Sequence, residues 1–323
     1  MRTETKSTQT CLDQHWEAVL ALKNTLRNVS RLPTCLGVAL GPEPRIALHP
    51  NHEEEWDLWI VWGSPVDLPS PQTAMLVMED ELQTRIHFAG GLKTGELAFW
   101  QRYLPYCFLS YQAQQLGRAI SVSHFAQTLD GKIATLGGDS KWIGNQENLK
   151  HAHRMRALCE GILIGGQTLV VDQPKLTVRH VSGPNPRRVV LASKLPDLSP
   201  LLACLDDPVW VIGLAESELA GYPHGYWLPR QHHGRIDGND VLRCLFEQGI
   251  HSVYVEGGSQ TTSNFLADGA IDILQLHLAP LIFGSGLDAL QLPTIQWVSE
   301  SIKFETSTFL RVGDGMMFVG KPA

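Results

Sequence analysis

Short apolar runs and amphipathic stretches alternate along the second two-thirds of the chain, from about residue 118 to the end. Apolar runs predict strands, and apolar residues repeated every three to four positions predict helices. The expected strands are 119–126, 161–164, 188–191, 209–212, 252–255, 273–279, 303–310 and 315–319; the expected helices are 145–158, 239–248 and 258–266. This order predicts an α/β fold with a mixed, mainly parallel sheet flanked by helices and with antiparallel edge strands.

The first part of the chain has a different pattern. Residues 12–27 predict a helix whose apolar face carries Trp16, Val19, Leu22 and Leu26. Prolines interrupt residues 33–71, where three tryptophans cluster, Trp56, Trp59 and Trp62. We interpret these rings as filling a small core rather than as an aromatic ligand pocket. Because the composition turns polar near residues 112–117, the sequence predicts a separate α+β region of unknown function at 1–117 and a second domain at 118–323.

Composition and charge narrow the class of protein. Hydrophobic residues make up 43% and charged residues 18% of the 323 residues, as in a globular protein with a sizeable core. The net charge of −7 disfavours broad binding to nucleic acid or to an anionic membrane, and no apolar stretch has the length of a membrane span. Residues 1–10 lack a signal-peptide core, and the six cysteines form no Cys-x-x-Cys pair. We therefore expect a cytoplasmic protein with reduced thiols and no metal site.

Two glycine turns follow apolar strands and are candidate ligand sites. Residues 165–168 (Gly-Gly-Gln-Thr) follow the strand at 161–164, and residues 256–259 (Glu-Gly-Gly-Ser) follow the strand at 252–255. Neither is a Gly-x-Gly-x-x-Gly or Walker loop, and a glycine pair alone often only satisfies tight geometry. Both would nevertheless lie at the carboxyl ends of parallel strands, where ligands bind in open α/β sheets. The second turn also opens a helix, whose free N–H groups can hold a phosphate.

Several single residues have both a chemical and a structural interpretation. Trp142, in a glycine-rich loop with Ser140, could wall the site of a flat heterocycle. Arg156 and Arg179 could each bind a phosphate through two hydrogen bonds, although an isolated arginine is more often solvated or paired. We interpret the histidines at 151, 153, 232 and 233 as surface residues rather than metal ligands, because no cysteine or carboxylate lies in a fitting frame.

In their order along the chain, these motifs resemble the reductase domain of the bifunctional riboflavin-biosynthesis deaminase–reductase family, a relative of the dihydrofolate reductase fold. The matching segments are Thr128–Ala134, Gly138–Ile143, Met155–Ala157, Ile164–Thr168, Asp172–Arg179, Glu256–Gly258 and Ala279–Gly284. Each segment is common by itself, but the ordered set at these spacings is specific. It covers most of residues 118–323.

The resemblance implies an NADPH-dependent, homodimeric oxidoreductase that converts the ribosyl group of a pyrimidine ribosylamino 5′-phosphate to ribityl. The implied cofactor contacts are Ala126, Trp142, Thr168, Asp172, Ser193, Gly258, Ser259, Gln260, Thr261, Thr262, Ser263 and Asn264. The implied substrate contacts are Ser140, Arg156, Leu176, Arg179 and Glu256. The two arginines would hold the sugar phosphate, and Glu256 would orient sugar hydroxyls or assist proton transfer, so Glu256 and Asp172 are the candidate catalytic residues. Hydride transfer needs close positioning more than a strong nucleophile.

The zinc deaminase domain that usually accompanies this reductase is not expected here. Such a domain needs a His-x-Glu motif and a Pro-Cys-x-x-Cys type pair. His52-Glu53-Glu54 fits the first, but residues 1–117 contain no cysteine pair, so we interpret it as a solvated acidic turn. Two other hypotheses remain: an NADPH-dependent reductase of another pteridine- or pyrimidine-like compound, and a non-catalytic ligand-binding relative. The joint presence of Thr168, Asp172, Arg179 and Glu256 disfavours the second.

Overall fold

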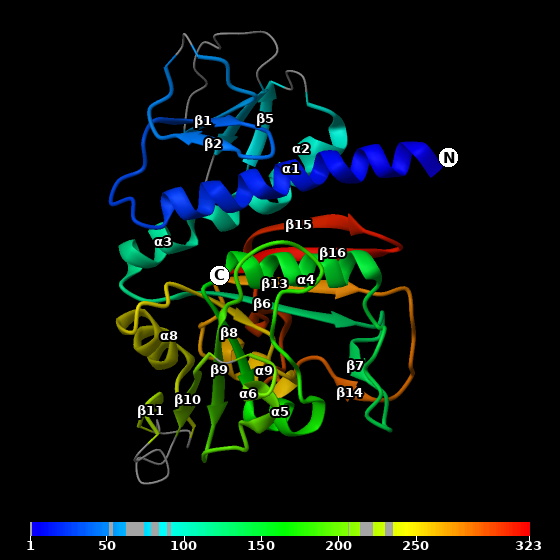
Figure 1. Cartoon of the computed structure of the whole chain (residues 1–323). Coiled ribbons are helices and arrows are strands. Elements are labelled where there is room, and N and C mark those ends of the chain that lie inside the picture. Colours follow the sequence, from blue (N-terminus) through cyan, green and yellow to red (C-terminus); the bar gives the residue numbers. More distant parts are fainter. Residues whose placement is uncertain are drawn as a thin grey trace. The chain divides into compact units, whose positions relative to one another are not determined.

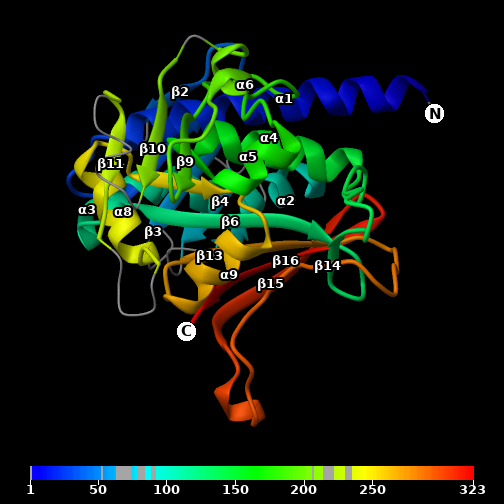
Figure 2. The same ribbon diagram turned by 90° about the horizontal axis from the view of Figure 1, so that it is seen from below.

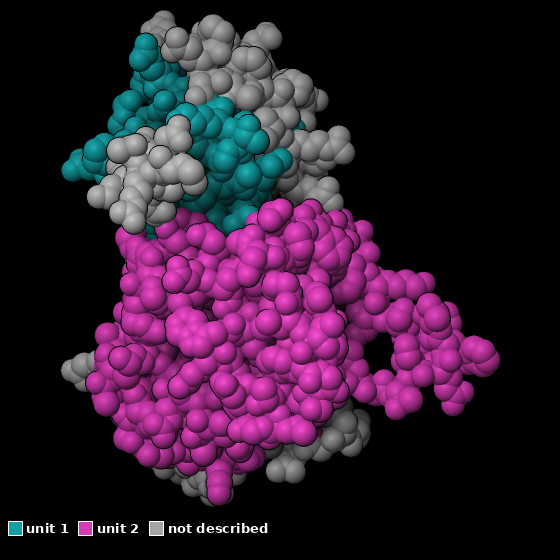
Figure 3. All heavy atoms as spheres, turned by 90° about the vertical axis from the view of Figure 1, so that its right-hand side faces the viewer, with its two compact units in different colours: residues 1–115 teal, residues 116–323 magenta. Residues whose placement is uncertain are grey.

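A computed structural model describes residues 2–51, 54–62, 74–78, 84–88, 92–205, 207–213, 222–229 and 235–323. The chain divides into two compact units, unit 1 (residues 1–115) and unit 2 (residues 116–323), which are coloured separately in Figure 3. The motif residues His52 and Glu53 and the pair at 232–233 lie outside the described residues. No helix in the described ranges is both long and apolar enough to cross a membrane.

In its described residues, unit 1 combines helices with a five-stranded mixed sheet (Figure 1). Its helices are α1 (Arg2–Leu26), α2 (Thr94–Tyr103) and α3 (Leu109–Leu116), with the 3-10 helix η1 (Leu104–Phe108) before α3. Its strands are β1 (Cys35–Ala39), β2 (Arg45–Ala47), β3 (Leu58–Trp62), β4 (Ala74–Met78) and β5 (Thr84–Phe88). The sheet order is β2-β1-β3-β4-β5; the pair β3–β4 is parallel and the other three pairs are antiparallel.

The tryptophans of unit 1 pack in its interior, as we interpreted them from the sequence. Trp59 is fully buried, and Trp56 is also buried. Trp62 packs edge-on against Phe108, with 5.4 Å between ring centroids. Trp16 of α1 is buried as well, which confirms the predicted apolar face of that helix. These rings therefore contribute core volume to unit 1.

Unit 2 is built around a nine-stranded sheet with the order β11-β10-β9-β8-β12-β6-β13-β16-β15 (Figures 1 and 2). In chain order the strands are β6 (Ile120–Gln127), β8 (Gly161–Gly165), β9 (Arg187–Ala192), β10 (Val209–Gly213), β11 (Gly225–Trp227), β12 (Ser252–Val255), β13 (Ile273–Leu278), β15 (Phe304–Val312) and β16 (Gly315–Pro322). Neighbours from β11 to β13 are parallel, whereas β13–β16 and β16–β15 are antiparallel. The predicted mainly parallel α/β fold with antiparallel edge strands is confirmed.

The helices of unit 2 are α4 (Gln146–Leu158), α5 (Gly166–Asp172), α6 (Ser199–Leu202), α8 (Gly238–Glu247) and α9 (Ser259–Ala267). Asn145 caps α4, since its side chain accepts a hydrogen bond of 2.8 Å from the Asn148 N–H. A two-stranded ribbon of β7 (Lys132–Ala134) and β14 (Leu287–Asp288) is held by an ion pair between Lys132 and Asp288.

The two faces of the parallel sheet pack against different helices. Residues of α8 and α9, among them Leu245 and Phe265, share a hydrophobic core with Val253 and Val255 of β12. The alternate β12 residue, Tyr254, points to the opposite face. There it stacks on His124 of β6, whose ring also contacts a histidine of α4. The face that carries α4 therefore has buried polar groups, while the face that carries α8 and α9 is apolar.

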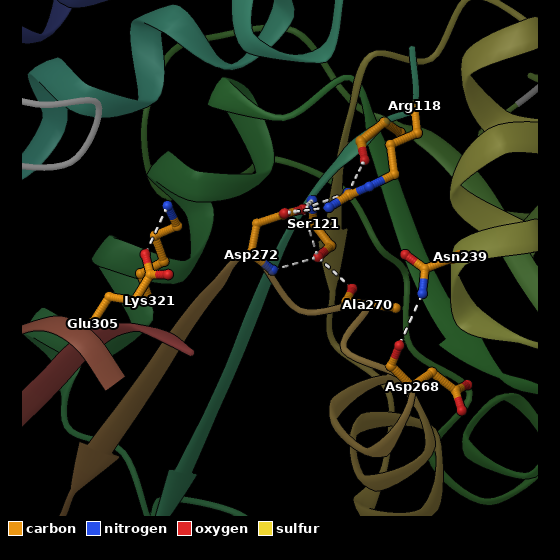
Figure 4. A network of polar contacts seen from close by, with 9 residues as sticks. Arg118, Ser121, Asn239, Asp268, Ala270, Asp272, Glu305 and Lys321 are labelled. Atoms are coloured by element: carbon orange, nitrogen blue, oxygen red, sulfur yellow. Dashed lines mark hydrogen bonds and ion pairs between the residues drawn. The ribbon is translucent and has the colours of Figure 1, made fainter. Parts of the chain in front are cut away.

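The amino ends of β6 and β13 are joined by a polar network (Figure 4). Arg118 donates to both carboxylate oxygens of Asp272, at 2.9 and 2.7 Å. One of these oxygens also accepts from the Ser121 N–H at 2.8 Å, and the Ser121 hydroxyl donates to the Ala270 carbonyl at 2.6 Å. Nearby, Asn239 donates to a backbone carbonyl at the end of α9. The charges at this end are thus satisfied within the protein.

Candidate active site

The two glycine turns predicted from the sequence lie side by side at the carboxyl ends of β8 and β12. These strands are neighbours, with Leu163 paired to Val255. A Cβ atom at Gly165 would lie 2.6 Å from the Thr261 hydroxyl oxygen, and one at Gly257 would lie 2.6 Å from the Thr261 Cβ. Glycine is needed at both positions, because a side chain would push Thr261 away. The close approach brings the start of α5 next to the start of α9.

Thr168 links the two turns, since its hydroxyl accepts a hydrogen bond of 3.1 Å from the Gly258 N–H. Ser259, the first residue of α9, is buried, and its hydroxyl has no hydrogen-bond partner among the described residues. A buried polar group without a partner is unusual in a folded protein. An unpartnered hydroxyl at a helix start, where backbone N–H groups are also free, suits a phosphate group.

The other residues of the predicted cofactor segment 258–264 lie on two sides of helix α9, one facing the protein interior and one facing outward. The hydroxyl of Thr262 donates to the Gly257 carbonyl at 3.3 Å, and that of Ser263 accepts from the Gln291 N–H at 2.8 Å. Both side chains are only 1% exposed. Gln260 is exposed and donates to the Asn264 side chain. The side chains at 262 and 263 therefore face the protein interior, which leaves the first turn of α9 as the part open to a ligand.

Arg156 and Glu256 form a two-hydrogen-bond ion pair between α4 and the end of β12. Arg156 Nε donates to Glu256 Oε1 at 2.7 Å, and Nη2 donates to Oε2 at 2.6 Å. The remaining guanidinium nitrogen donates to the Thr177 carbonyl at 3.0 Å. Burial opposes the charge of Arg156, but the Glu256 carboxylate raises the pKa of the guanidinium above its ordinary value. Because all three guanidinium nitrogens have partners, Arg156 fixes the orientation of Glu256.

The segment Asp172–Arg179 leads from the end of α5 to the Arg156–Glu256 ion pair. Leu176 is 1% exposed, so its side chain lies in the core and only its backbone could meet a ligand. Arg179 is exposed; its Nη1 donates to the Thr177 hydroxyl at 2.8 Å. Burial and the nearby Arg156 charge lower the pKa of Arg179 from its ordinary value. Arg179 is thus more accessible to an anion than Arg156 is.

Residues with a strained backbone conformation lie in segments that the sequence motifs identified. Three non-glycine residues in the described ranges have positive φ angles: Trp142 at 67°, Gln173 at 44° and Leu176 at 54°. This conformation is costly for residues with a side chain and clusters at functional sites, although at Gln173 it forms the left-handed C-cap of α5. The strained positions lie in the Trp142 loop and in the Asp172–Arg179 segment.

A cleft of about 450 Å³ lies between β6, α4 and the Trp142 loop. Of the predicted site residues, Ala126, Trp142 and Glu256 line it. Trp142 is 78% exposed. The cleft is also lined by residues that were not predicted to contact a ligand, among them His124, Asn148 and Lys141. The cleft therefore brings together the Glu256 carboxylate, the Trp142 ring, the Lys141 cation and the polar side chains of His124 and Asn148.

The other predicted site residues lie outside the lining of this cleft. Ser140 is exposed in the loop before Trp142, and Ser193 is exposed just after β9. Asp172 is the last residue of α5 and is exposed, although partial burial raises the pKa of its carboxyl above the ordinary value. The predicted set is therefore spread along the carboxyl ends of the strands rather than gathered in one pocket.

The interpretation of His151 and His153 as surface residues is wrong. His151 is 1% exposed and shares a hydrogen bond of 3.0 Å with the Gln275 side chain of β13. His153 is fully buried, and its Nδ1 accepts from the Arg179 N–H at 3.0 Å. Hydrogen bonds of this kind let polar rings occupy the inner face of α4, which a hydropathy pattern does not reveal. No group of three or more metal-ligating residues occurs in the described part of the chain.

Comparison with known proteins matches the model of the RibD C-terminal domain family to residues 121–318, and the chain belongs to this family. It is 33% identical to the riboflavin biosynthesis protein RibD of Aquifex aeolicus over 217 residues, which are 66% of this chain and 60% of that protein. It is 31% identical over 210 residues to the 2,5-diamino-6-ribosylamino-4(3H)-pyrimidinone 5′-phosphate reductase of Methanothermobacter thermautotrophicus, covering 62% of this chain and 96% of that protein. The chain thus matches three-fifths of the Aquifex protein.

Solved structures show the same fold. A diaminohydroxyphosphoribosylaminopyrimidine deaminase/5-amino-6-(5-phosphoribosylamino)uracil reductase from Thermotoga maritima has a TM-score of 0.54 and 32% identity, over 67% of this chain and 60% of that one. Acinetobacter baumannii RibD has a TM-score of 0.60 and 18% identity, over 96% of this chain and 99% of that one. This second likeness concerns the fold alone. Because it covers nearly the whole chain, the likeness extends into unit 1.

Proposed function

We propose that residues 118–323 form an NADPH-dependent reductase of riboflavin biosynthesis. It would convert the ribosyl group of a pyrimidine ribosylamino 5′-phosphate to ribityl. The observation that supports this most strongly is the cleft at the carboxyl end of the sheet, where Ala126, Trp142 and Glu256 line one space beside the paired glycine turns. Relatives that are 31% and 32% identical to the chain have names that include the reduction of such phosphates.

The paired glycine turns fit a dinucleotide. Gly257 and Gly165 allow a close backbone approach, and the start of α9 offers N–H groups together with the unpartnered Ser259 hydroxyl. Thr168, Gly258 and Ser259 would hold the phosphate groups, and Ala126 and Trp142 would contact the cofactor in the cleft. NADPH, when bound, supplies the hydride. We assign Asp172 to the cofactor as well, because it lies outside the cleft lining and so away from the proposed reaction centre.

The substrate would lie between Glu256 and Arg179. Arg179 would bind the phosphate, while Arg156 acts through Glu256, whose carboxylate it orients with two hydrogen bonds. Reduction of the opened sugar adds a hydride to its first carbon and a proton to the adjacent nitrogen or oxygen. Glu256 would orient the sugar hydroxyls or relay this proton. Ser140, Leu176 through its backbone, and Ser193 remain proposed contacts from the family pattern.

Steady-state oxidation of NADPH by the purified full chain tests the proposal. The deaminated and the non-deaminated pyrimidine ribosylamino phosphates are supplied in turn, with NADH in a parallel series. We expect turnover with at least one of the two phosphates and a preference for NADPH. NADPH binding without turnover of either phosphate would favour another pyrimidine- or pteridine-like substrate. Absence of NADPH binding in a titration would favour the non-catalytic hypothesis.

We further propose that the enzyme is a cytoplasmic homodimer that associates through the segment between β14 and β15, which projects from unit 2 in Figure 2. This segment, which includes η2 (Val298–Glu300), exposes Trp297 to 68% and Val298 to 87%. Beside it lies an apolar cavity of about 740 Å³, lined by residues that include Leu276, Phe304 and Phe318. Exposed apolar side chains beside an apolar cavity are typical of interaction sites.

Light scattering during gel filtration of the wild type and of Trp297→Ser tests the dimer. We expect a wild-type mass of two chains and a shift toward one chain in the variant. A monomeric wild type at micromolar concentration would disprove this part of the proposal.

A further inference from the structure

His124 is a buried polar residue that the proposed mechanism does not use. It lies in β6, is 6% exposed, and neither of its ring nitrogens has a hydrogen-bond partner in the described chain. Its ring stacks on Tyr254 at 6.0 Å and meets the ring of His151 edge-on at 5.4 Å. Packing thus holds the ring in place without satisfying its nitrogens. A buried polar group left in this state requires an explanation, because its desolvation is not compensated.

The position of this ring gives the explanation, since His124 lines the cleft that also contains Glu256. Asn148 of α4 lines the same cleft, and its side-chain oxygen is likewise buried without a partner. Asn148 lies next to the ring, and its side chain acts against the lowering of the His124 pKa. Two adjacent groups that lack hydrogen bonds of ordinary geometry, one from a strand and one from a helix, therefore border one space. Their missing partners are most simply supplied by a ligand in that space.

The charge state of the ring defines what it can bind. Burial, together with the neighbouring His277 and Arg156, lowers the pKa of His124 to about 3. The ring is therefore neutral at physiological pH, with one nitrogen that donates and one that accepts. Such a group suits a hydroxyl, which also both donates and accepts, whereas a phosphate is better held by a cation such as Arg179.

We propose that His124 and Asn148 bind the hydroxyl groups of the substrate's opened sugar, on the cleft wall formed by β6 and α4. This assignment rests on the proposed reductase function. It divides the substrate between a neutral site for the sugar and a cationic site for the phosphate. The aromatic Trp142 at the cleft is then left for a flat ring.

A matched pair of leucine substitutions tests the assignment. His277 is also fully buried with two unpartnered ring nitrogens, but it does not line the cleft. We expect His124→Leu to raise the KM for the pyrimidine ribosylamino phosphate and to lower kcat/KM by about 10- to 100-fold. His277→Leu should change kcat/KM by less than about twofold, because the His277 ring is a neighbour of His124 but does not line the cleft.

Two further measurements separate binding from folding. Neither leucine variant should lower Tm substantially, since each removes unsatisfied nitrogens, and NADPH affinity should be unchanged in both. His124→Gln, which retains a donor and an acceptor, should recover part of the lost kcat/KM. An active wild type with unchanged kcat/KM in His124→Leu overturns the inference alone. A wild type that turns over neither phosphate overturns the proposed function, and the sugar-site assignment with it.

Discussion

Buried polar groups at the two ends of the parallel strands in unit 2 differ in whether they have hydrogen-bond partners. At the amino ends, the Asp272 carboxylate accepts from both Arg118 and the Ser121 backbone, and the Ser121 hydroxyl is bonded in turn. At the carboxyl ends, His124 and Ser259 are buried with unpartnered polar atoms. Both ends belong to the same strands, so the difference does not come from the sheet itself. The difference separates polar groups whose hydrogen bonds stabilise the fold from polar groups that we propose to bind a ligand.

Strained backbone conformations also lie near the carboxyl ends of the strands. Three described non-glycine residues have a positive φ, and they belong to the loops that follow β7 and α5 and border the candidate site: Trp142, Gln173 and Leu176. Strain of this kind persists only where the surrounding fold compensates for it. The closed network at the amino ends can provide part of that compensation. Substitutions at the two ends should therefore have different consequences for stability and activity.

The largest effect is expected at Glu256, because this residue both lines the cleft and forms the ion pair with the buried Arg156. Glu256→Ala leaves the buried Arg156 charge unpaired, so the free energy of unfolding should fall by about 3–5 kcal/mol. Urea unfolding measures this loss. Glu256→Gln, which retains the shape, should fold but lose about 100-fold in kcat. Full turnover by Glu256→Gln would exclude the proton role, and an unchanged stability of Glu256→Ala would show that the ion pair is not formed in solution.

Acid should weaken unit 2 through the histidines near the carboxyl ends. Burial, with Arg156 and neighbouring histidines contributing, lowers the pKa of both His124 and His153 to about 3 in the folded chain. Below the ordinary value of 6.5 the unfolded chain binds protons that the folded chain does not, so stability falls as the pH drops from 6.5 toward 3. At pH 5 the loss is about 2 kcal/mol for each histidine. Urea unfolding at pH 7 and pH 5 should show a smaller loss in His124→Leu; an equal loss would place the titration elsewhere.

The amino-end network should affect stability without affecting chemistry. Asp272→Ala removes the acceptor for Arg118 and for the Ser121 N–H, so we expect a loss of about 2 kcal/mol in the free energy of unfolding. At a temperature where the variant is folded, kcat/KM should stay within about twofold of the wild type. Asp272→Asn should lose less stability, because it retains an acceptor. A large fall in kcat/KM with little change in stability would contradict the division between the two ends.

The smallest predicted effect concerns the glycine turns. Gly257→Ala places a Cβ against Thr261 and should shift the turn, so the Kd for NADPH should rise about tenfold, equivalent to about 1.4 kcal/mol. Gly95→Ala is the matched control, since a Cβ there has no neighbour within 4 Å. Fluorescence titration with NADPH compares the two variants. Equal affinities would show that this turn does not carry the cofactor.

The sheet of unit 2 could be predicted because its elements are long and strongly patterned. The strand expected at 161–164 and the helix expected at 145–158 correspond to β8 and α4 with little change at their ends. Unit 1 was less accessible to prediction, since its five strands are short and are interrupted by prolines. Its parallel pair β3–β4 brings together segments that no local pattern connects.

The candidate site could be predicted only in outline. The motifs identified Trp142 and Glu256, which the structure places at one cleft. They could not indicate that the side chains of Leu176 and Thr262 point inward, because family motifs record positions and not directions. His124 was missed, although a histidine inside an otherwise buried strand is itself a signal. That neither ring nitrogen has a partner becomes visible only when the surrounding elements are placed.

The position of β6 in the sheet also has a consequence for synthesis. β6 is the first strand of unit 2 to leave the ribosome, yet it pairs with β12 and β13, where Ser252 meets Ile120 and Ile273 meets Val122. Until those late segments emerge, β6 has no strand partners on either side, and its apolar residues stay exposed to other chains. Pairings this distant in sequence also form slowly. The nascent chain should therefore depend on chaperones during translation, and the cleft beside β6 should be among the last parts of the protein to form.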